Sequence, residues 1–524
     1  MSASSGWIRT VSPDLEKPSL QDNTADVDRL VKALRRELEC LEVRVDLPLL
    51  KTVPARLRQW EYRVRAVVAK EGPGWRLVDV FPREDDSGVW GVAVDIGTST
   101  VVVRIVDLEN RTSVGESGFV NPQTAYGEDI LTRIHFASNE DGLETLRKVL
   151  VERLNKEIAR LAQAYAVPLK RLVGASLAGN TTMTHLFLGL NPFWICREPY
   201  IPAVNRLDLL TASQVGLGIH EAAPVLVFPN VGSYFGGDLI AGILASGLDR
   251  REGVSILVDV GTNAEVVLGN QDWLMACAGA AGPALEGGVA RMGMMAGPGV
   301  IDHVGLEAGT GELEIHTIGE GPPVGICGSG LIDLVSRLFL TGRIDMRGKF
   351  IPEACGERLV DEDGIPTFTV VPEDDSGTGE ALTLSQPDVD ALMRSKAAMY
   401  TILTTITGMV GLSWQDLDRF FVAGTFGSYI DPQSAVTLGM IPDLPLETYE
   451  SLGNTSLEGA TEGLLDGEAL PRIEDIRDRI TYIELNVNQE FMNLFSAAKF
   501  IPHTDRALFP SVADWEAAVS TLAP

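Results

Sequence analysis

Two segments of this 524-residue chain are nearly alike: Val92-Ala-Val-Asp-Ile-Gly-Thr-Ser-Thr100 and Leu257-Val-Asp-Val-Gly-Thr-Asn-Ala-Glu265. Each runs from apolar residues into Asp, an aliphatic residue, Gly, Thr and a small polar residue, after which apolar residues resume. This pattern predicts a buried strand, a tight turn and a returning strand. The glycine lets backbone approach a ligand closely, and the hydroxyl and amide groups can hydrogen-bond phosphate. Two copies therefore indicate two related halves that hold one phosphate chain between paired hairpins.

The two aspartates of these segments stand at strand ends, where a carboxylate is costly to bury unless it is solvated, hydrogen-bonded or near a cation. We expect Asp95 and Asp259 to bind water around Mg²⁺ or to orient the attacking water beside a triphosphate, although turn capping would explain either one alone. No G-x-x-x-x-G-K-[ST] segment occurs, so the chain is not a P-loop enzyme. The expected phosphate-binding residues of the two turns are Gly97, Thr98, Ser99, Thr100, Gly261, Thr262 and Asn263.

Further candidates lie on a predicted helix and in glycine-rich turns. Asp238 falls in the first turn of a predicted helix over 236–247, where capping and a metal-linked role are about equally supported. Glycine-rich turns before helices can serve phosphate, ribose or base, although a plain turn is the alternative. The candidates in three such turns are Gly282 and Glu286; Gly328, Ser329 and Gly330; and Gly424, Thr425, Phe426 and Gly427.

Composition limits the partners. The net charge of −29 argues against nucleic acid or an anionic membrane as the main partner, because both require a basic surface. No stretch approaches the roughly 18–20 uncharged apolar residues that cross a bilayer, and the N-terminus does not resemble a signal peptide. We therefore expect a cytoplasmic protein. The five cysteines are scattered, which favours reduced, mostly buried thiols, and the role of Cys327 stays open.

The pattern of elements divides the chain. Residues 1–88 are expected to form a linker plus a small α+β middle domain, with a helical pattern over 27–38, a strand pair at 62–68 and 75–81, and a charged linker over 82–88. From residue 89 onward strands and helices alternate, with halves at approximately 89–250 and 251–524. Helices are expected over 142–165, 236–247 and 387–408, strands over 171–177, 224–231 and 420–423, and a β-rich region over 303–384.

With the hairpins placed, the chain resembles the superfamily of actin, hexokinase-type sugar kinases and heat-shock chaperone ATPases. The two hairpins are similar to its phosphate loops, Phe421–Gly427 to its adenosine motif, and Gly237–Gly247 to a helix whose acidic residue works near Mg²⁺. The resemblance implies an α/β fold in which two duplicated ribonuclease-H-like halves form an actin-like ATPase cleft, preceded by the small α+β domain. It implies ATP and Mg²⁺ as cofactors, Asp95, Asp238 and Asp259 as catalytic residues, and Asp95 and Asp259 near the metal.

More narrowly, nearly the whole chain resembles the ATP-dependent reductive activators of corrinoid proteins. That family returns the cobalt of a methyltransferase corrinoid protein from Co(II) to Co(I), coupling ATP to an uphill electron transfer. The resemblance implies a corrinoid protein as partner. The segments that carry it are Asn121–Gln123, Tyr126–Asp129, Gly179–His185, Ala281–Gly287, Ile326–Asp333, Asn488–Asn493 and Ile501–Asp505.

Family members usually begin with a ferredoxin-like domain whose four cysteines bind a [2Fe–2S] cluster, and no such cysteine run occurs in this sequence. Either that domain has been removed from the chain, or the electron comes from a separate ferredoxin-like donor. Two other functions stay open: a small-molecule kinase of the same superfamily and a non-catalytic, actin-like assembly protein. The sequence also leaves open a homodimer, the identity of the corrinoid protein and its methyl donor.

Overall fold

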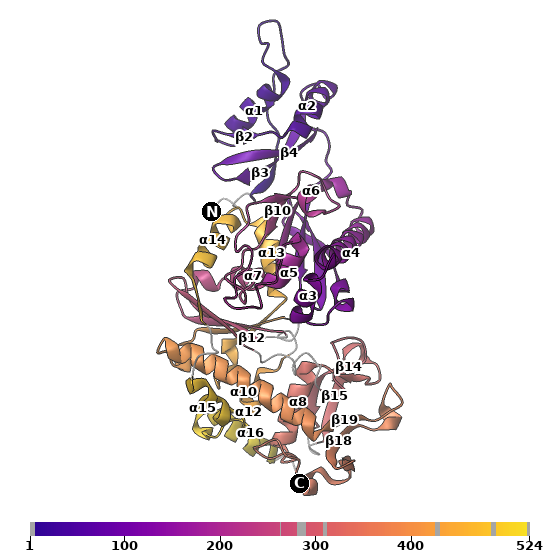
Figure 1. Ribbon diagram of the computed structural model, residues 1–524, viewed down its shortest axis with the longest axis vertical. Helices are drawn as coiled ribbons and strands as arrows, with labels where there is room; N and C mark the ends of the chain where they lie inside the picture. The colour runs from indigo at the N-terminus through magenta and orange to yellow at the C-terminus, as the bar shows by residue number, and fades with distance from the viewer. Residues whose placement is uncertain are drawn as a thin grey trace. The chain divides into compact units, whose positions relative to one another are not determined.

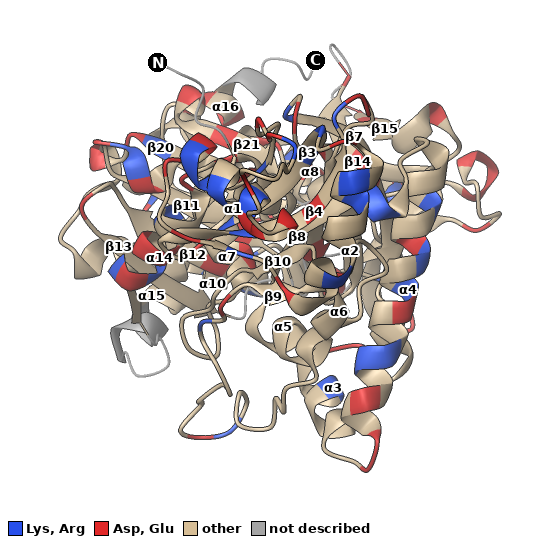
Figure 2. Cartoon of the chain, turned by 90° about the horizontal axis from the view of Figure 1, so that it is seen from above, with Lys and Arg blue, Asp and Glu red and all other residues tan. Residues whose placement is uncertain are grey.

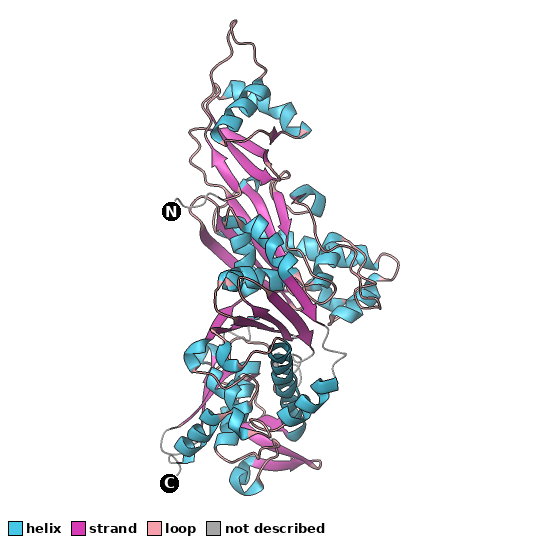
Figure 3. Ribbon diagram, turned by 90° about the vertical axis from the view of Figure 1, so that its left-hand side faces the viewer, coloured by secondary structure: helices cyan, strands magenta, loops and turns pink. Residues whose placement is uncertain are grey.

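The computed structural model describes residues 6–261, 264–279, 290–307, 312–424, 430–483 and 489–520. The chain forms two compact units, one made of Met1–Ala245 and Thr455–Asp478, the other of Ser246–Asn454 and Arg479–Pro524. Each unit is described by itself. Figure 3 shows that both combine strands with many helices, and Figure 2 shows both signs of charge along helix α4 (Gly142–Ala164) of the first unit.

The first unit begins with a small α+β domain (Figure 1). Its sheet has the order β1-β3-β4-β2, in which β3 and β4 form the predicted hairpin and β2 runs parallel to β4. The spacing of Leu30, Leu34, Val53 and Leu57 puts one apolar stripe of each helix into the domain's core, which confirms the predicted helix and strand pair. The elements are β1 (Ile8–Val11), α1 (Asp26–Glu37), β2 (Val43–Arg44), α2 (Leu47–Gln59), β3 (Val64–Glu71) and β4 (Gly74–Pro82).

The rest of the first unit is built on a sheet of order β7-β6-β5-β8-β10-β9. Strands β7, β6 and β5 are antiparallel neighbours, whereas β8 and β10 run parallel to β5. The predicted strand over 224–231 is shorter and ends at Val227. The strands are β5 (Trp90–Ile96), β6 (Thr100–Asp107), β7 (Thr112–Val120), β8 (Leu172–Gly179), β9 (Leu210–Thr211) and β10 (Pro224–Val227).

Helices cover both faces of this sheet. Because side chains alternate along a strand, Val92 and Val94 of β5 pack among the buried residues of α4, while Gly91 contacts Leu464 on the other face. The helix that carries Leu464 therefore returns to this unit from a distant part of the chain. The helices of this part are α3 (Ile130–Ala137), α4, α5 (Thr181–Leu188), α6 (Ala212–Val215), α7 (Gly237–Ser246), α13 (Thr455–Leu465) and α14 (Ala469–Arg479).

The second unit repeats the first sheet. Its strand order β21-β20-β11-β12-β13-β22 contains an antiparallel set, β11 to β13, flanked by the parallel strands β20 and β21, which matches β5 to β7 flanked by β8 and β10. This match confirms the duplicated halves inferred from the paired hairpins. The strands are β11 (Ser255–Val260), β12 (Ala264–Gly269), β13 (Leu274–Gly279), β20 (Arg419–Ala423), β21 (Tyr449–Gly453) and β22 (Ile480–Ile483).

The region expected to be β-rich contains two small sheets, β15-β14-β16 and β17-β18-β19, together with a largely buried helix, α8 (Gly328–Leu340). Helix α10 (Gln386–Met409) confirms the helix predicted over 387–408. The remaining elements of this unit are β14 (Val300–Leu306), β15 (Leu313–Thr317), β16 (Gly325–Ile326), α9 (Pro352–Cys355), β17 (Leu359–Glu362), β18 (Ile365–Val371), β19 (Leu382–Ser385), α12 (Pro432–Leu438), α15 (Gln489–Ala498) and α16 (Pro510–Ser520).

Close packing of α13 gives a test of this fold. A Cβ at Gly459 would lie 2.1 Å from the carbonyl oxygen of Ala241 on α7, whereas a Cβ at Gly408 on α10 would meet nothing within 4 Å. We expect Gly459→Ala to lower the free energy of unfolding by about 1–3 kcal/mol, because the two helices must move apart. Gly408→Ala is the matched control and should be neutral or slightly stabilising. Thermal denaturation of both variants measures the difference, and equal melting temperatures would contradict this packing.

Candidate nucleotide-binding site

The first phosphate loop joins β5 to β6, as the sequence predicts. Asp95 is partly buried near the end of β5, and its Oδ1 accepts a 2.7 Å hydrogen bond from the hydroxyl of Ser456 at the start of α13. A Cβ at Gly97 would lie 2.4 Å from the carbonyl oxygen of Thr100, so no other residue fits this turn without a shift of backbone. The loop is therefore a tight backbone turn with a hydrogen-bonded carboxylate at its base.

Two asparagines that the sequence analysis did not single out hold this loop. Buried Asn121 donates from Nδ2 to the Gly97 carbonyl oxygen at 2.9 Å, and its backbone N–H donates to the Ser99 carbonyl oxygen at 2.8 Å. Asn180 caps α5 and donates from Nδ2 to Oγ1 of Thr98 at 3.0 Å. Both lie in segments that carry the family resemblance, but nothing in the local pattern assigns them to this loop.

Asp238 lies in the same unit, in the first turn of α7, as predicted. Its Oδ1 accepts a 2.9 Å hydrogen bond from the backbone N–H of Leu239. A Cβ at Gly236 would lie 2.5 Å from Cα of Asn180, so the loop before α7 packs against the cap of α5. Through Asn180, the structure places the start of α7 next to the residues that hold the first loop.

The second phosphate loop belongs to the other unit. Asp259 of β11 pairs in register with Glu265 of β12 and with Ala423 of β20. Gly424, which follows β20, has φ +85°, and a Cβ there would lie 3.0 Å from Oδ1 of Asp259. The start of the second predicted phosphate loop therefore lies beside the start of the segment that resembles the adenosine motif. Seven candidate residues lie outside the described ranges: Thr262, Asn263, Gly282, Glu286, Thr425, Phe426 and Gly427.

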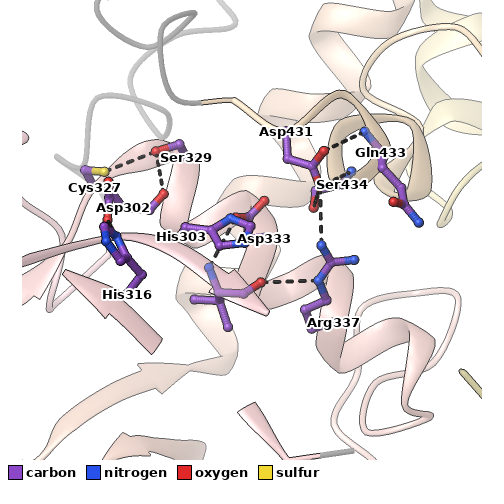
Figure 4. A network of polar contacts seen from close by, with 11 residues as sticks. Asp302, His303, His316, Cys327, Ser329, Asp333, Arg337, Asp431, Gln433 and Ser434 are labelled. Atoms are coloured by element: carbon purple, nitrogen blue, oxygen red, sulfur yellow. Dashed lines mark hydrogen bonds and ion pairs between the residues drawn. The ribbon is translucent and has the colours of Figure 1, made fainter. Parts of the chain in front are cut away.

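The third glycine-rich turn begins helix α8 (Figure 4). Ser329 is 2% exposed, and its hydroxyl donates to the Asp302 carbonyl oxygen at 3.0 Å and lies 3.2 Å from Sγ of Cys327. A Cβ at Gly330 would lie 2.5 Å from the Ile301 carbonyl oxygen. The turn is therefore packed tightly against β14, and a role of Gly328, Ser329 and Gly330 in cofactor binding stays a prediction.

A polar network on α8 connects this helix to the segment that follows the adenosine motif. Asp333 is fully buried and lies 2.5 Å from Nδ1 of His303. Burial raises the pKa of its carboxyl, and a hydrogen bond to Ser434 and the charge of His303 act against this rise. Arg337 contacts Asp431, whose carboxylate caps α12 (Figure 4). The network thus ties α8 to the start of α12.

The cysteines form no cluster site. All are free thiols; Cys40 and Cys196 are partly exposed, and Cys277, Cys327 and Cys355 are buried. Within the described ranges, no group of three or more His, Cys, Asp or Glu side chains could hold a metal ion. The same ranges hold no helix with the length and apolar content to cross a membrane.

Three models of known protein families match consecutive parts of the chain. A family model described as the C-terminal domain of RACo, the ASKHA domain, matches residues 253–513; the RACo middle region matches residues 90–251 and the RACo linker region residues 7–87. The chain belongs to the RACo family of reductive activators. A solved structure titled "Reductive activator for corrinoid,iron-sulfur protein" is 37% identical with a TM-score of 0.89, covering 97% of this chain and 81% of that chain.

Two curated relatives agree with this assignment. The corrinoid activation enzyme RamQ of Eubacterium limosum is 32% identical over 442 residues, covering 80% of this chain and 72% of the relative. The [Co(II) methylated amine-specific corrinoid protein] reductase of Methanosarcina barkeri is 23% identical over 442 residues, covering 78% of this chain and 76% of the relative.

The contacts of Asn121 predict how the first loop is held. Asn121→Ala leaves the partly buried Gly97 carbonyl oxygen without this donor, at a cost of about 1 kcal/mol. We expect faster hydrogen exchange of the amides of residues 97–100 in native protein. Asn110→Ala, at an exposed turn between β6 and β7, is the control and should leave these amides unchanged. Unchanged exchange in Asn121→Ala would contradict the proposed hold.

The cysteine environments predict a reactivity order. Burial raises the pKa of the Cys277 thiol to about 12, so almost none of it is thiolate at pH 8. We expect iodoacetamide to alkylate the partly exposed Cys40 and Cys196 in native protein, and Cys277 only after denaturation. Peptide mass spectrometry measures each site, and early alkylation of Cys277 in folded protein would contradict its burial.

Proposed function

We propose that this RACo-family protein is an ATPase that activates a corrinoid protein reductively, so that the partner's cobalt passes from Co(II) to Co(I). One observation carries the nucleotide part of the proposal: the same sheet occurs twice, and each copy ends its first strand with Asp in a glycine turn. Membership of the family supports the reductive part. The names of the relatives support a corrinoid protein of a methyltransferase system as the partner.

The residues present suit a magnesium nucleotide. Mg²⁺ prefers hard oxygen ligands and retains bound water, and Asp95, Asp238 and Asp259 offer carboxylate oxygens at strand ends and at a helix start. The cradle at Gly97 leaves no room for a side chain, as a backbone that binds phosphate requires. When bound, Mg²⁺ would neutralise charge on the phosphate oxygens.

The protein's own groups do the remaining work in this proposal. Backbone N–H groups and hydroxyls of Thr98, Ser99 and Thr100 would bind phosphate oxygens, while Asp95 and Asp259 would orient the attacking water. Because Asp95 already accepts the Ser456 hydroxyl, its orientation is set before ATP arrives. Preorganisation of this kind reduces the reorganisation needed during hydrolysis.

Reduction of cobalt needs one electron from a low-potential donor. The scattered cysteines of these 524 residues offer no iron–sulfur ligand set, so we propose that a ferredoxin-like carrier outside them supplies the electron. ATP hydrolysis would then alter the docked partner so that Co(II) accepts this electron. The cobalt is the substrate in this scheme and binds no residue of this chain permanently.

The activity is tested with a Co(II) corrinoid protein, reduced ferredoxin, ATP and Mg²⁺ under anaerobic conditions. We expect the absorption of Co(I) to appear when the protein and ATP are both present, and the corrinoid protein to raise the ATPase rate. A non-hydrolysed ATP analogue is the control and should not sustain reduction. If neither the spectrum nor the ATPase rate responded to the partner, the proposal would fail.

The two phosphate loops give a separate prediction. Asp95→Asn and Asp259→Asn should each lower kcat for ATP hydrolysis by about 10²–10⁴-fold, because the variants keep the shape of the side chain but lose its charge. Asp107→Asn, at the opposite end of the β5–β6 hairpin, should retain wild-type kcat. Steady-state kinetics and calorimetric ADP binding distinguish lost hydrolysis from lost binding. Full activity in both loop variants would exclude these carboxylates from the reaction.

A further inference from the structure

The contact between Ser456 and Asp95 joins residues separated by 361 positions in the sequence. Ser456 is 6% exposed and lies in the first turn of α13, and its Oγ is 2.7 Å from Oδ1 of Asp95. A buried hydroxyl that donates a hydrogen bond to a carboxylate fixes the orientation of the carboxylate oxygen that accepts it. Since Asp95 belongs to the proposed ATP site, the inference that follows rests on the proposed function.

Helix α13 is held so that Ser456 cannot easily move. Gly459 lets α13 approach the backbone of α7, and Gly463 packs against the side chain of Ser176 on β8, whose hydroxyl oxygen would lie 3.0 Å from a Cβ there. The indole Nε1 of Trp7 donates to the Gly463 carbonyl oxygen at 2.6 Å. The helix is thus fastened to the sheet at several points along its length, and its first turn is aimed at the end of β5.

The chain enters α13 directly from the sheet of the second unit. Strand β21 ends at Gly453, which pairs in register with Ala423 of β20 after a bulge, and Ala423 also pairs with Asp259 of β11. Gly453 has φ +65°, a conformation that favours glycine. The passage between units falls between Asn454 and Thr455. A short covalent path therefore runs from the strand ends beside Asp259 to the side chain that holds Asp95.

We propose that Ser456 is a positioning residue of the ATP site, and that the segment Gly453–Ser456 couples the two phosphate loops. Ser456 holds the Asp95 carboxylate in the orientation that hydrolysis needs. Because Ser456 follows the end of β21 so closely, a shift of that strand end changes the Asp95 orientation. The second loop thereby acts on the first through the chain itself.

Ser456→Ala tests the first part of the proposal. It should lower kcat for ATP hydrolysis about ten-fold or more, the factor expected from losing one hydrogen bond to a charged group, while KM and ADP affinity change little. Ser456→Thr keeps the hydroxyl and should restore kcat. Glu458 lies on the same helix as Ser456 and forms an ion pair with Arg104 of β6. Glu458→Gln removes this ion pair without altering the contact to Asp95, and should keep wild-type kcat. Melting temperatures measured in parallel identify any variant that fails to fold.

A double-mutant cycle shows whether Ser456 acts through Asp95. In the Asp95→Asn background, Ser456→Ala should have almost no further effect on kcat, because the carboxylate that it holds is gone. Additive losses would show that Ser456 acts elsewhere and would overturn the proposal. Wild-type kcat in Ser456→Ala would overturn it equally.

Hydrogen exchange tests the role of Ser456 without requiring ATP hydrolysis. The amides of residues 97–100 should exchange faster in Ser456→Ala than in wild type or Glu458→Gln. If wild-type protein hydrolysed no ATP, the proposed function would fail. The exchange measurement would still test whether the hydrogen bond from Ser456 to Asp95 stabilises the adjoining loop. Unchanged exchange in Ser456→Ala would refute it.

Gly453→Ala tests the coupling. It strains the end of β21 without altering either partner of the Ser456–Asp95 contact. We expect a several-fold loss of kcat that disappears in the Ser456→Ala background. A loss that persisted in that background would show that the strand end acts independently, and no loss at all would show that it does not influence Asp95.

Discussion

A carboxylate at the end of a buried strand needs hydrogen-bond donors, and the first unit depends on how that need is met. Asp95 lies on the face of β5 opposite to α4, because side chains alternate along the strand. A helix must therefore cover that face and bring a donor with it. Helix α13 does both, with Ser456 at its start.

The need for a hydrogen-bond donor to Asp95 accounts for a segment of the first unit that is distant in sequence. Residues 455–478 belong to the first unit although the 209 residues Ser246–Asn454 precede them in the second. Gly459 lets the returning helix approach the backbone of α7, where a Cβ would clash with the Ala241 carbonyl oxygen, and Gly463 packs closely against the side chains of Ser176 and Phe228. The packing of α13 therefore also places the hydroxyl of Ser456 beside Asp95.

The duplication gives two sheets that share the order of five strands, while the sixth strand lies beside β10 in the first sheet and beside β13 in the second. In the first unit the glycine turn is held by the side chains of Asn121 and Asn180, and Ser456 holds Asp95 at the base of the turn. In the second, Asp259 lies beside Gly424, which begins the glycine-rich turn after β20.

The sequence by itself predicted the strand pairs β5–β6 and β11–β12, the family, and helices over 27–38, 142–165 and 387–408, which the structure shows as α1, α4 and α10. Each of these predictions rests on local periodicity or on residues close together in the chain. The region 303–384, expected to be β-rich, contains two small sheets, and helix α8 begins at the glycine-rich turn over 327–330. Only the tertiary structure decided which side chains hold Asp95 and its loop. Those partners lie 24, 82 and 361 positions from the groups that they contact. A hydrogen bond over such separations is set by packing of whole elements, which no local pattern encodes.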